Sequence, residues 1–227
     1  MKLRIKIKLI LALTVLSFNV LAAGNLHLDN ANTDISDAAS LQNGAKLFMN
    51  YCSGCHAISF MRYNRIAQDL CLSNSLVAEH LMFAGEKLGD TITTAMPIED
   101  STKWFGGPPP DLSLVARSKG TDWIYTYLRS FYEDESKIFG VNTKVLENAS
   151  MPDALWSLKK GVPEAEFDQD VRDITNFLDY VGEPAKLIRT SLGVWVLLFL
   201  GVLLVLTYLL KKEYWKDVKY GIWRPRE

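Results

Sequence analysis

The sequence predicts a mainly α-helical domain with long loops, followed by one C-terminal transmembrane helix. Apolar residues recur at helical spacing in several segments, and stretches rich in glycine and proline separate these segments. No segment shows the clear alternation of apolar and polar residues that is typical of a strand. Residues 190–210 form a run of 21 residues without a charge that is apolar on all sides, which is typical of a membrane span.

The helical pattern allows the soluble part to be divided into elements. Helical segments are expected at 41–48, 75–85, 111–117, 122–131 and 168–180. Extended or loop segments are expected at 24–40, 89–110 and 132–151. Asp111 and Asp122 are expected to cap the helices that follow them. Gly182 and Pro184 are expected to end the last helix of the domain, just before the membrane span.

The N-terminal residues 1–23 have the pattern of a signal peptide. Four basic residues precede a mostly apolar run that ends in the small residues Ala22 and Ala23, as in a cleavable export signal. The alternative is an uncleaved N-terminal anchor. Cleavage is favoured because the apolar run is short for a complete membrane span.

The C-terminal region predicts how the chain lies in the membrane. As a helix, the uncharged run 190–210 would reach roughly 30 Å, the thickness of the hydrocarbon core of a bilayer, and we expect the transmembrane helix at 187–210. The tail, residues 211–227, holds six basic and three acidic residues, and such a tail is expected on the cytoplasmic side. We therefore expect a periplasmic domain at 24–186, anchored by a single pass in the bacterial inner membrane.

The soluble domain is strongly acidic although the whole chain has a formal net charge of −1. Residues 24–186 contain 23 Asp and Glu against 14 Lys and Arg, a balance of −9. This charge argues against nucleic acid as a partner, because phosphates would be repelled. The acidic run 133–135 suggests a docking face for a basic protein, although such residues often serve only solubility.

The segment from Cys52 to His56 carries the clearest chemical motif. Cys-x-x-Cys-His is the attachment pattern of a covalent c-type haem. Two thiols three positions apart, Cys52 and Cys55, can form thioethers with the two vinyl groups of one porphyrin. The next residue, His56, can then supply its imidazole to the iron. An export signal strengthens this interpretation because c-type haem is attached outside the cytoplasm.

The sequence offers two other uses of these cysteines. A thioredoxin-like redox pair would need a βαβ context that the sequence does not show. A zinc site could use Cys52 and Cys55 with Cys71 and His80, but it would leave His56 without a role. With haem at the motif, Cys71 is an odd thiol that we expect to be buried as a small apolar residue.

The second axial ligand of the iron is less clearly encoded. Candidates are His27, His80 and the methionines, of which Met96 and Met151 are each followed by proline. A residue before proline favours an extended backbone, which suits a loop lying against a haem face. From the order of residues alone, Met96 and Met151 remain equivalent candidates.

The chain resembles the cytochrome c1 family over nearly its whole mature length. The shared features are Cys52-Ser-Gly-Cys-His56, Arg62-Tyr-Asn-Arg65, Trp104-Phe-Gly, Pro109-Pro-Asp-Leu-Ser113, Ala116-Arg117, Asp122-Trp-Ile-Tyr-Thr-Tyr-Leu128, Met151-Pro-x-x-Leu-Trp156 and one C-terminal span. The resemblance implies a class I-like cytochrome c domain whose iron is held by His56 and Met151. It also implies that Lys119 and Trp123 hold a haem propionate, where many relatives carry arginine and tyrosine.

The resemblance further implies an electron-transfer role in the respiratory chain, as a subunit of ubiquinol–cytochrome c reductase. The partners would be cytochrome b, a Rieske iron–sulfur subunit that reduces the haem, and a cytochrome c that oxidises it. No catalytic residue is expected in this chain, because quinol chemistry would occur on the other subunits. The alternative is a membrane-tethered electron shuttle or haem sensor that works without reductase partners.

Overall fold

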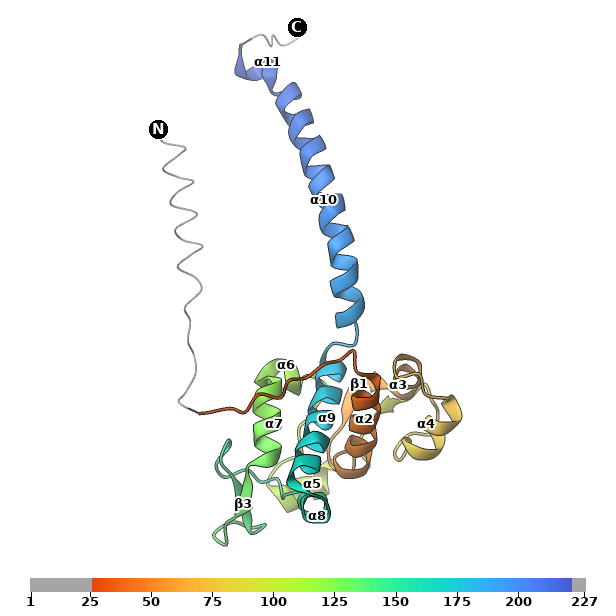
Figure 1. Ribbon diagram of the computed structural model, residues 1–227, viewed down its shortest axis with the longest axis vertical. Helices are drawn as coiled ribbons and strands as arrows, with labels where there is room; N and C mark the ends of the chain where they lie inside the picture. Colours follow the sequence, from red (N-terminus) through yellow and green to blue (C-terminus); the bar gives the residue numbers. More distant parts are fainter. Residues whose placement is uncertain (1–25, 222–227) are drawn as a thin grey trace.

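The computed structural model describes residues 26–221. The predicted signal peptide and the last part of the basic tail lie outside the described residues. Figure 1 shows a helical domain from which one long helix, α10 (Lys186–Tyr214), extends away. The predicted helical domain with long loops and a C-terminal apolar helix is therefore confirmed.

The core of the domain is built on α2 (Ala38–Tyr51) and α9 (Glu164–Gly182), which lie side by side in Figure 1. Their apolar faces meet, and the rings of Phe48 and Phe177 are 5.6 Å apart. The backbones approach so closely at Gly44 that an added Cβ would lie 2.0 Å from the carbonyl oxygen of Asp173. Gly44 is thus required by the contact, because any side chain would collide with backbone.

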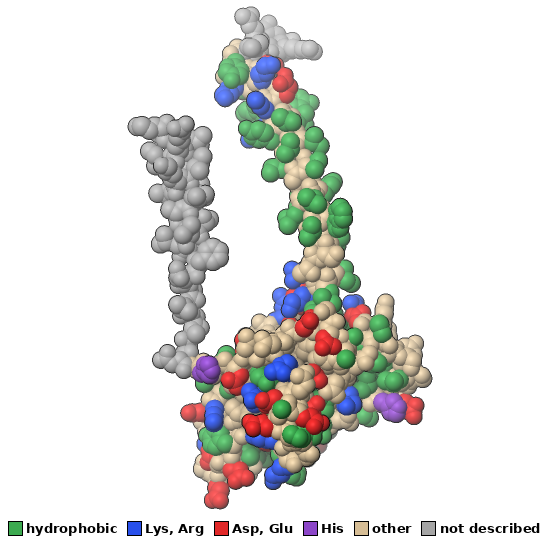
Figure 2. Space-filling view, viewed as in Figure 1, with side chains coloured by type: hydrophobic (Ala, Val, Ile, Leu, Met, Phe, Trp, Pro, Cys, Tyr) green, Lys and Arg blue, Asp and Glu red, His purple; other side chains and the backbone are tan. Residues whose placement is uncertain are grey.

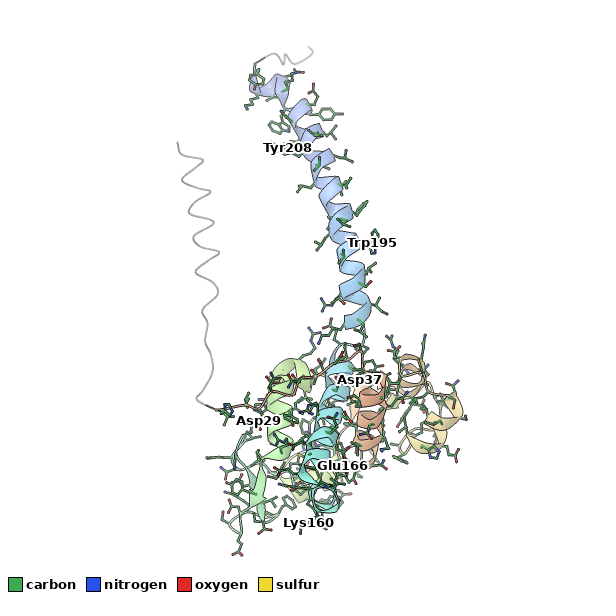
Figure 3. The ribbon with its side chains drawn as sticks, viewed as in Figure 1. Asp29, Asp37, Lys160, Glu166, Trp195 and Tyr208 are labelled. Carbon is green, nitrogen blue, oxygen red and sulfur yellow. The ribbon has the colours of Figure 1, made fainter. Side chains whose placement is uncertain are left out.

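The N-terminal arm, residues 26–36, runs across α7 (Thr121–Arg129) and α9 (Figure 1). The backbone N–H of Asp29 donates to Thr126 at 2.8 Å, and that of Ala31 donates to Asp122 at 2.9 Å. Arg129 bridges the carboxylates of Asp29 and Asp168, and Figure 3 labels Asp29 on this arm. Asp122 was expected to cap its helix. That prediction was wrong, because α7 begins after Gly120 and Asp122 instead holds the arm.

Two short antiparallel sheets, which the sequence did not predict, complete the domain. Their paired strands are β1 (Ile58–Arg62) with β2 (Thr91–Ile92), and β3 (Phe131–Glu133) with β4 (Val141–Thr143). The strands are too short for an alternating pattern to stand out. The remaining helices are α3 (Tyr63–Asp69), α4 (Asn74–His80), α5 (Ile98–Phe105), α6 (Val115–Lys119), α8 (Trp156–Gly161) and α11 (Lys216–Lys219).

Helix α5 lies inside a segment that was expected to be loop. Its first turn carries Glu99 and Asp100, and it ends at Gly106, which has a left-handed backbone with φ of 78°. These are ordinary start and stop signals of a helix. The helix was missed because it is mostly exposed and buries only Ser101 fully, so its apolar periodicity is weak.

Two further local predictions were wrong. Cys71 is exposed, not buried, and occupies the turn after α3 with φ of 54°. Asp111 does not cap a helix, since α6 begins later, at Val115. Its carboxylate instead accepts the backbone N–H groups of Ser59 and Ser113 at 3.0 and 2.7 Å, and so joins strand β1 to the loop before α6.

Helix α10 is 29 residues long and is, within residues 26–221, the one helix long and apolar enough to cross a membrane. Figure 2 shows hydrophobic side chains around it and basic side chains at its far end. Trp195 and Tyr208 lie along this helix (Figure 3). Where the helix leaves the domain, Arg189 pairs with Glu183 at 2.6 Å and Lys186 pairs with Asp179 at 3.2 Å.

Candidate haem site

The Cys-x-x-Cys-His segment forms a tight turn at the end of α2. Asp37 is the N-cap of this helix and its side chain accepts the N–H of Ser40, and the helix ends at Tyr51. The N–H of Cys52 still donates to Phe48 at 2.8 Å, and the N–H groups of Cys55 and His56 fold back onto the carbonyl of Cys52 at 3.1 and 2.8 Å. Backbone hydrogen bonds within the segment therefore fix the three motif side chains relative to one another.

His56 is buried and its imidazole has a defined tautomer. Nδ1 lies 2.8 Å from the carbonyl oxygen of Pro110. A carbonyl oxygen can only accept, so Nδ1 carries the proton and the lone pair is left on Nε2. Burial lowers the pKa of His56, against smaller opposing effects of the Pro110 carbonyl and the Asp111 carboxylate. The neutral ring with a free Nε2 is the form that binds a metal.

The two motif thiols lie in an environment unlike that of a redox-active pair. Burial, and to a lesser extent the nearby Cys55, raises the pKa of Cys52 to about 12. Burial also raises the pKa of Cys55. Redox-active pairs of the Cys-x-x-Cys type lower the pKa of one thiol to generate a thiolate. This environment therefore argues against the thioredoxin-like alternative.

The three motif side chains line a cavity of about 700 Å³. This volume suits a large organic cofactor. Its wall combines the end of α2, the loop through Pro108–Pro110, one face of α7, the loop around Met151, and Ile174 and Leu178 of α9. Most of these side chains are apolar. The cavity thus offers two thiols, an imidazole and a thioether sulfur around an apolar space, a donor set that fits a covalent haem.

Met151 and Met96 are separated by the structure although the sequence left them equivalent. Met151 lies on the cavity wall together with His56, whereas Met96 is not among the residues that line it. Cys71 and His80, the other members of the alternative zinc set, are exposed and also lie outside the lining. The geometry therefore favours the haem interpretation and Met151.

A model of the Cytochrome C1 family matches residues 30–218 of the chain. The chain is also 47% identical to the cytochrome c1 of Allochromatium vinosum, with 87% of this chain and 92% of that protein covered. The chain belongs to the cytochrome c1 family. It is also 41% identical to the ammonia monooxygenase gamma subunit of Nitrosomonas europaea, covering 92% and 97% of the two chains. The cytochrome c1 of Rhodospirillum rubrum is 31% identical, covering 81% and 84%.

Family membership confirms the main predictions from the sequence. The chain binds a covalent c-type haem and is the electron-transfer subunit of ubiquinol–cytochrome c reductase. It is a membrane-anchored member of that complex, and its own role is that of a redox carrier.

The six residues assigned to the haem from the motif and the family resemblance all line the cavity: Cys52, Cys55, His56, Lys119, Trp123 and Met151. Lys119 and Trp123 lie next to each other, with the ammonium nitrogen 5.5 Å from the centre of the indole ring. This contact is a cation–π interaction. The pair therefore places one positive charge and one N–H donor at the cavity wall, as a propionate partner would require, and the assignment stays a prediction.

Two functional groups were missed by the sequence analysis. One is the backbone carbonyl of Pro110, which orients His56; a backbone group leaves no trace in residue type. The other is Tyr127, whose hydroxyl lies 3.6 Å from Sδ of Met151. The spacing of four between Trp123 and Tyr127 was a signal that these two rings share one face of α7.

Proposed function

We propose that this chain carries electrons on the periplasmic side of the bacterial inner membrane, from the Rieske subunit to a cytochrome c. Cys52 and Cys55 would hold the haem through thioether links, and His56 and Met151 would ligate its iron. When bound, the haem supplies a one-electron couple. Methionine in place of a second histidine raises its potential, which suits a late position in the chain of carriers.

The observation that carries this proposal is the convergence of the donors on one cavity. The motif turn presents the two thiols, the hydrogen bond to the Pro110 carbonyl leaves Nε2 of His56 free for a ligand, and Met151 lies on the same wall. The apolar lining would exclude water from a bound haem, and Lys119 would supply a positive charge for its propionates. The residues thus bind, orient and shield, and none of them performs substrate chemistry.

Solubilising the membrane in mild detergent tests the role of the chain within the complex. We expect the haem-stained band to migrate with cytochrome b and the Rieske subunit on a native gel. Migration of the haem-stained chain alone, in a membrane where those two subunits still migrate together, would contradict it and favour a tethered shuttle.

The proposed topology can be tested with the exposed Cys71. A membrane-impermeant maleimide added to intact spheroplasts should label Cys71, and a Cys71→Ser variant should remain unlabelled. A Cys71→Ser/Val218→Cys variant places the thiol on the tail, where Val218 is exposed. That variant should be labelled only after lysis. Labelling of the tail in intact spheroplasts would reverse the proposed orientation.

For the acceptor, we propose docking through the hairpin of β3 and β4, where Glu133 and Glu135 are exposed. Asp134 is otherwise engaged: hydrogen bonds from Ser136 and Asn142 lower its pKa and hold the turn. Figure 2 shows acidic side chains gathered at this lower end of the domain.

The docking proposal is tested by the salt dependence of association with a basic cytochrome c. The rate should fall as ionic strength rises, and a Glu133→Gln/Glu135→Gln variant should flatten this slope. The matched control is Glu164→Gln/Glu166→Gln, which removes two exposed charges at the start of α9. Equal slopes in the two variants would refute docking at the hairpin.

A further inference from the structure

The hydroxyl of Tyr127 contacts the sulfur that we assign as the distal ligand. The oxygen lies 3.6 Å from Sδ of Met151, within the range of a hydrogen bond to sulfur. The hydroxyl must be the donor, because a thioether sulfur has lone pairs but no proton. One of the two lone pairs of the sulfur is then engaged by Tyr127, and the other is left for a metal.

The ring of Tyr127 is held firmly enough to aim this hydroxyl. It stacks on Trp123 with ring centres 4.9 Å apart and planes 9° apart. Its other neighbour is Phe131, in an edge-on contact at 5.3 Å. Tyr127 is 8% exposed. Both ring contacts come from the same short stretch of chain, α7 and the start of β3, so the hydroxyl has a fixed direction.

Met151 itself lies in a segment without such local support. Residues 144–155, between β4 and α8, form neither helix nor strand. The carbonyl of Asp153 and its side chain hold the turn that follows, through Trp156 and Leu155. Of the hydrogen bonds in the described residues, the one from Tyr127 is the one that reaches the Met151 side chain.

We propose that Tyr127 is a positioning residue that sets the direction and the electron-donating strength of the Met151 sulfur. The proposal rests on the ligation by Met151 proposed above. A sulfur that accepts a hydrogen bond donates less electron density through its other lone pair. Weaker donation disfavours the ferric state more than the ferrous state, so the hydrogen bond raises the reduction potential.

The test is Tyr127→Phe in the full-length chain, which removes the hydroxyl and keeps the ring stack. We expect the equilibrium constant for reduction to fall about threefold to tenfold, the range for loss of one hydrogen bond. A tenfold fall corresponds to a potential lower by about 59 mV for one electron. Incorporation of 3-fluorotyrosine at position 127, whose hydroxyl is a stronger donor, should shift the potential in the opposite direction.

The matched control is Tyr125→Phe. Tyr125 lies on the same helix and is 3% exposed, but its hydroxyl accepts from Arg172 at 3.3 Å and is not part of the cavity wall. This variant should leave the potential unchanged. Equal shifts in the two variants, or no shift in Tyr127→Phe, would overturn the proposal.

The Met151→Leu background separates this proposal from the one on which it rests. If Met151 is the ligand, Met151→Leu loses the weak sulfur-to-iron absorption band, and adding Tyr127→Phe then changes the potential no further. The same shift in both backgrounds would mean that Tyr127 acts on the haem without the sulfur, and would refute positioning. Retention of the band in Met151→Leu would refute the ligation itself.

Discussion

The two sides of the haem cavity are built in different ways. On the motif side, five consecutive residues, Cys52 to His56, are fixed by hydrogen bonds within their own turn at the end of a buried helix. On the Met151 side, the ligand lies in a segment without helix or strand and contacts Tyr127, 24 positions earlier in the chain. One side is encoded locally and the other through the tertiary fold.

The largest expected effect concerns the motif side of the cavity. A Cys52→Ala/Cys55→Ala variant should lose covalent haem completely, because no thiol remains to form the thioether links. Haem peroxidase staining after denaturing electrophoresis measures this directly. Cys71→Ala is the control and should stain like the unmodified chain, since Cys71 is exposed outside the cavity. Staining that persists in the double variant would refute the motif assignment.

The next largest effect concerns the Met151 side of the cavity. Met151→Leu should abolish the sulfur-to-iron absorption band and lower the midpoint potential substantially, because a thioether ligand is lost while the haem stays attached. Visible spectroscopy and potentiometric titration measure the two changes. Met96→Leu, a change of similar volume outside the cavity, should cost at most about 1.5 kcal/mol of packing and leave both readouts intact. If Met96→Leu lost the band and Met151→Leu kept it, Met96 and not Met151 would be the iron ligand.

The motif side also depends on the close contact between α2 and α9. Gly44→Ala should destabilise the domain by about 1–3 kcal/mol or more, because the new Cβ meets the backbone of Asp173 and one helix must move. Gly161→Ala is a suitable control, since its Cβ would meet nothing within 4 Å. Chemical unfolding measures the free energy of unfolding of both variants. Similar stability of the two variants would contradict the tight helix packing described here.

The smallest expected effect is the pH dependence of stability that two aspartates contribute. Asp111 lies on the motif side of the cavity and Asp153 on the Met151 side. Burial acts to raise the pKa of Asp111, but hydrogen bonds from Ser113 and Ser59 outweigh it and lower the pKa. Burial raises the pKa of Asp153, beside Met151. Asp111 therefore stabilises the fold above its unfolded pKa, near the usual 3.8 of an aspartate, and this contribution is lost as pH falls. The contribution of Asp153 has the opposite sign and is lost as pH rises.

Asp111→Asn should therefore reduce stability by about 1 kcal/mol at pH 7, a small loss because the side chain is exposed and partly screened. The loss should be smaller below pH 4, where the carboxylate of Asp111 becomes protonated. Asp153→Asn should not reduce stability at pH 7. Urea unfolding at pH 7 and pH 3 measures both variants. An equal loss for both at pH 7 would show that the two loops do not differ as described.

The same contrast explains what could be predicted from the sequence. The haem motif, the C-terminal apolar helix and the α2 and α9 helices depend on short spacings, and these predictions agree with the structure. The role of Asp122, the exposure of Cys71 and the hydrogen bond of Tyr127 depend on which segments meet in space. Met151 was assigned through the family resemblance, because residue spacing alone did not distinguish it from Met96.

The junction between the domain and α10 has a consequence for how electrons reach and leave the haem. Only residues 183–185 separate α9 from α10, and the ion pairs of Arg117 and Arg189 with Glu183 and of Lys186 with Asp179 brace this corner. A connection of three residues with ion pairs across it leaves little chain to act as a hinge. We therefore expect the haem cavity to keep a nearly constant distance from the membrane, so that electron donors and acceptors have to come to it.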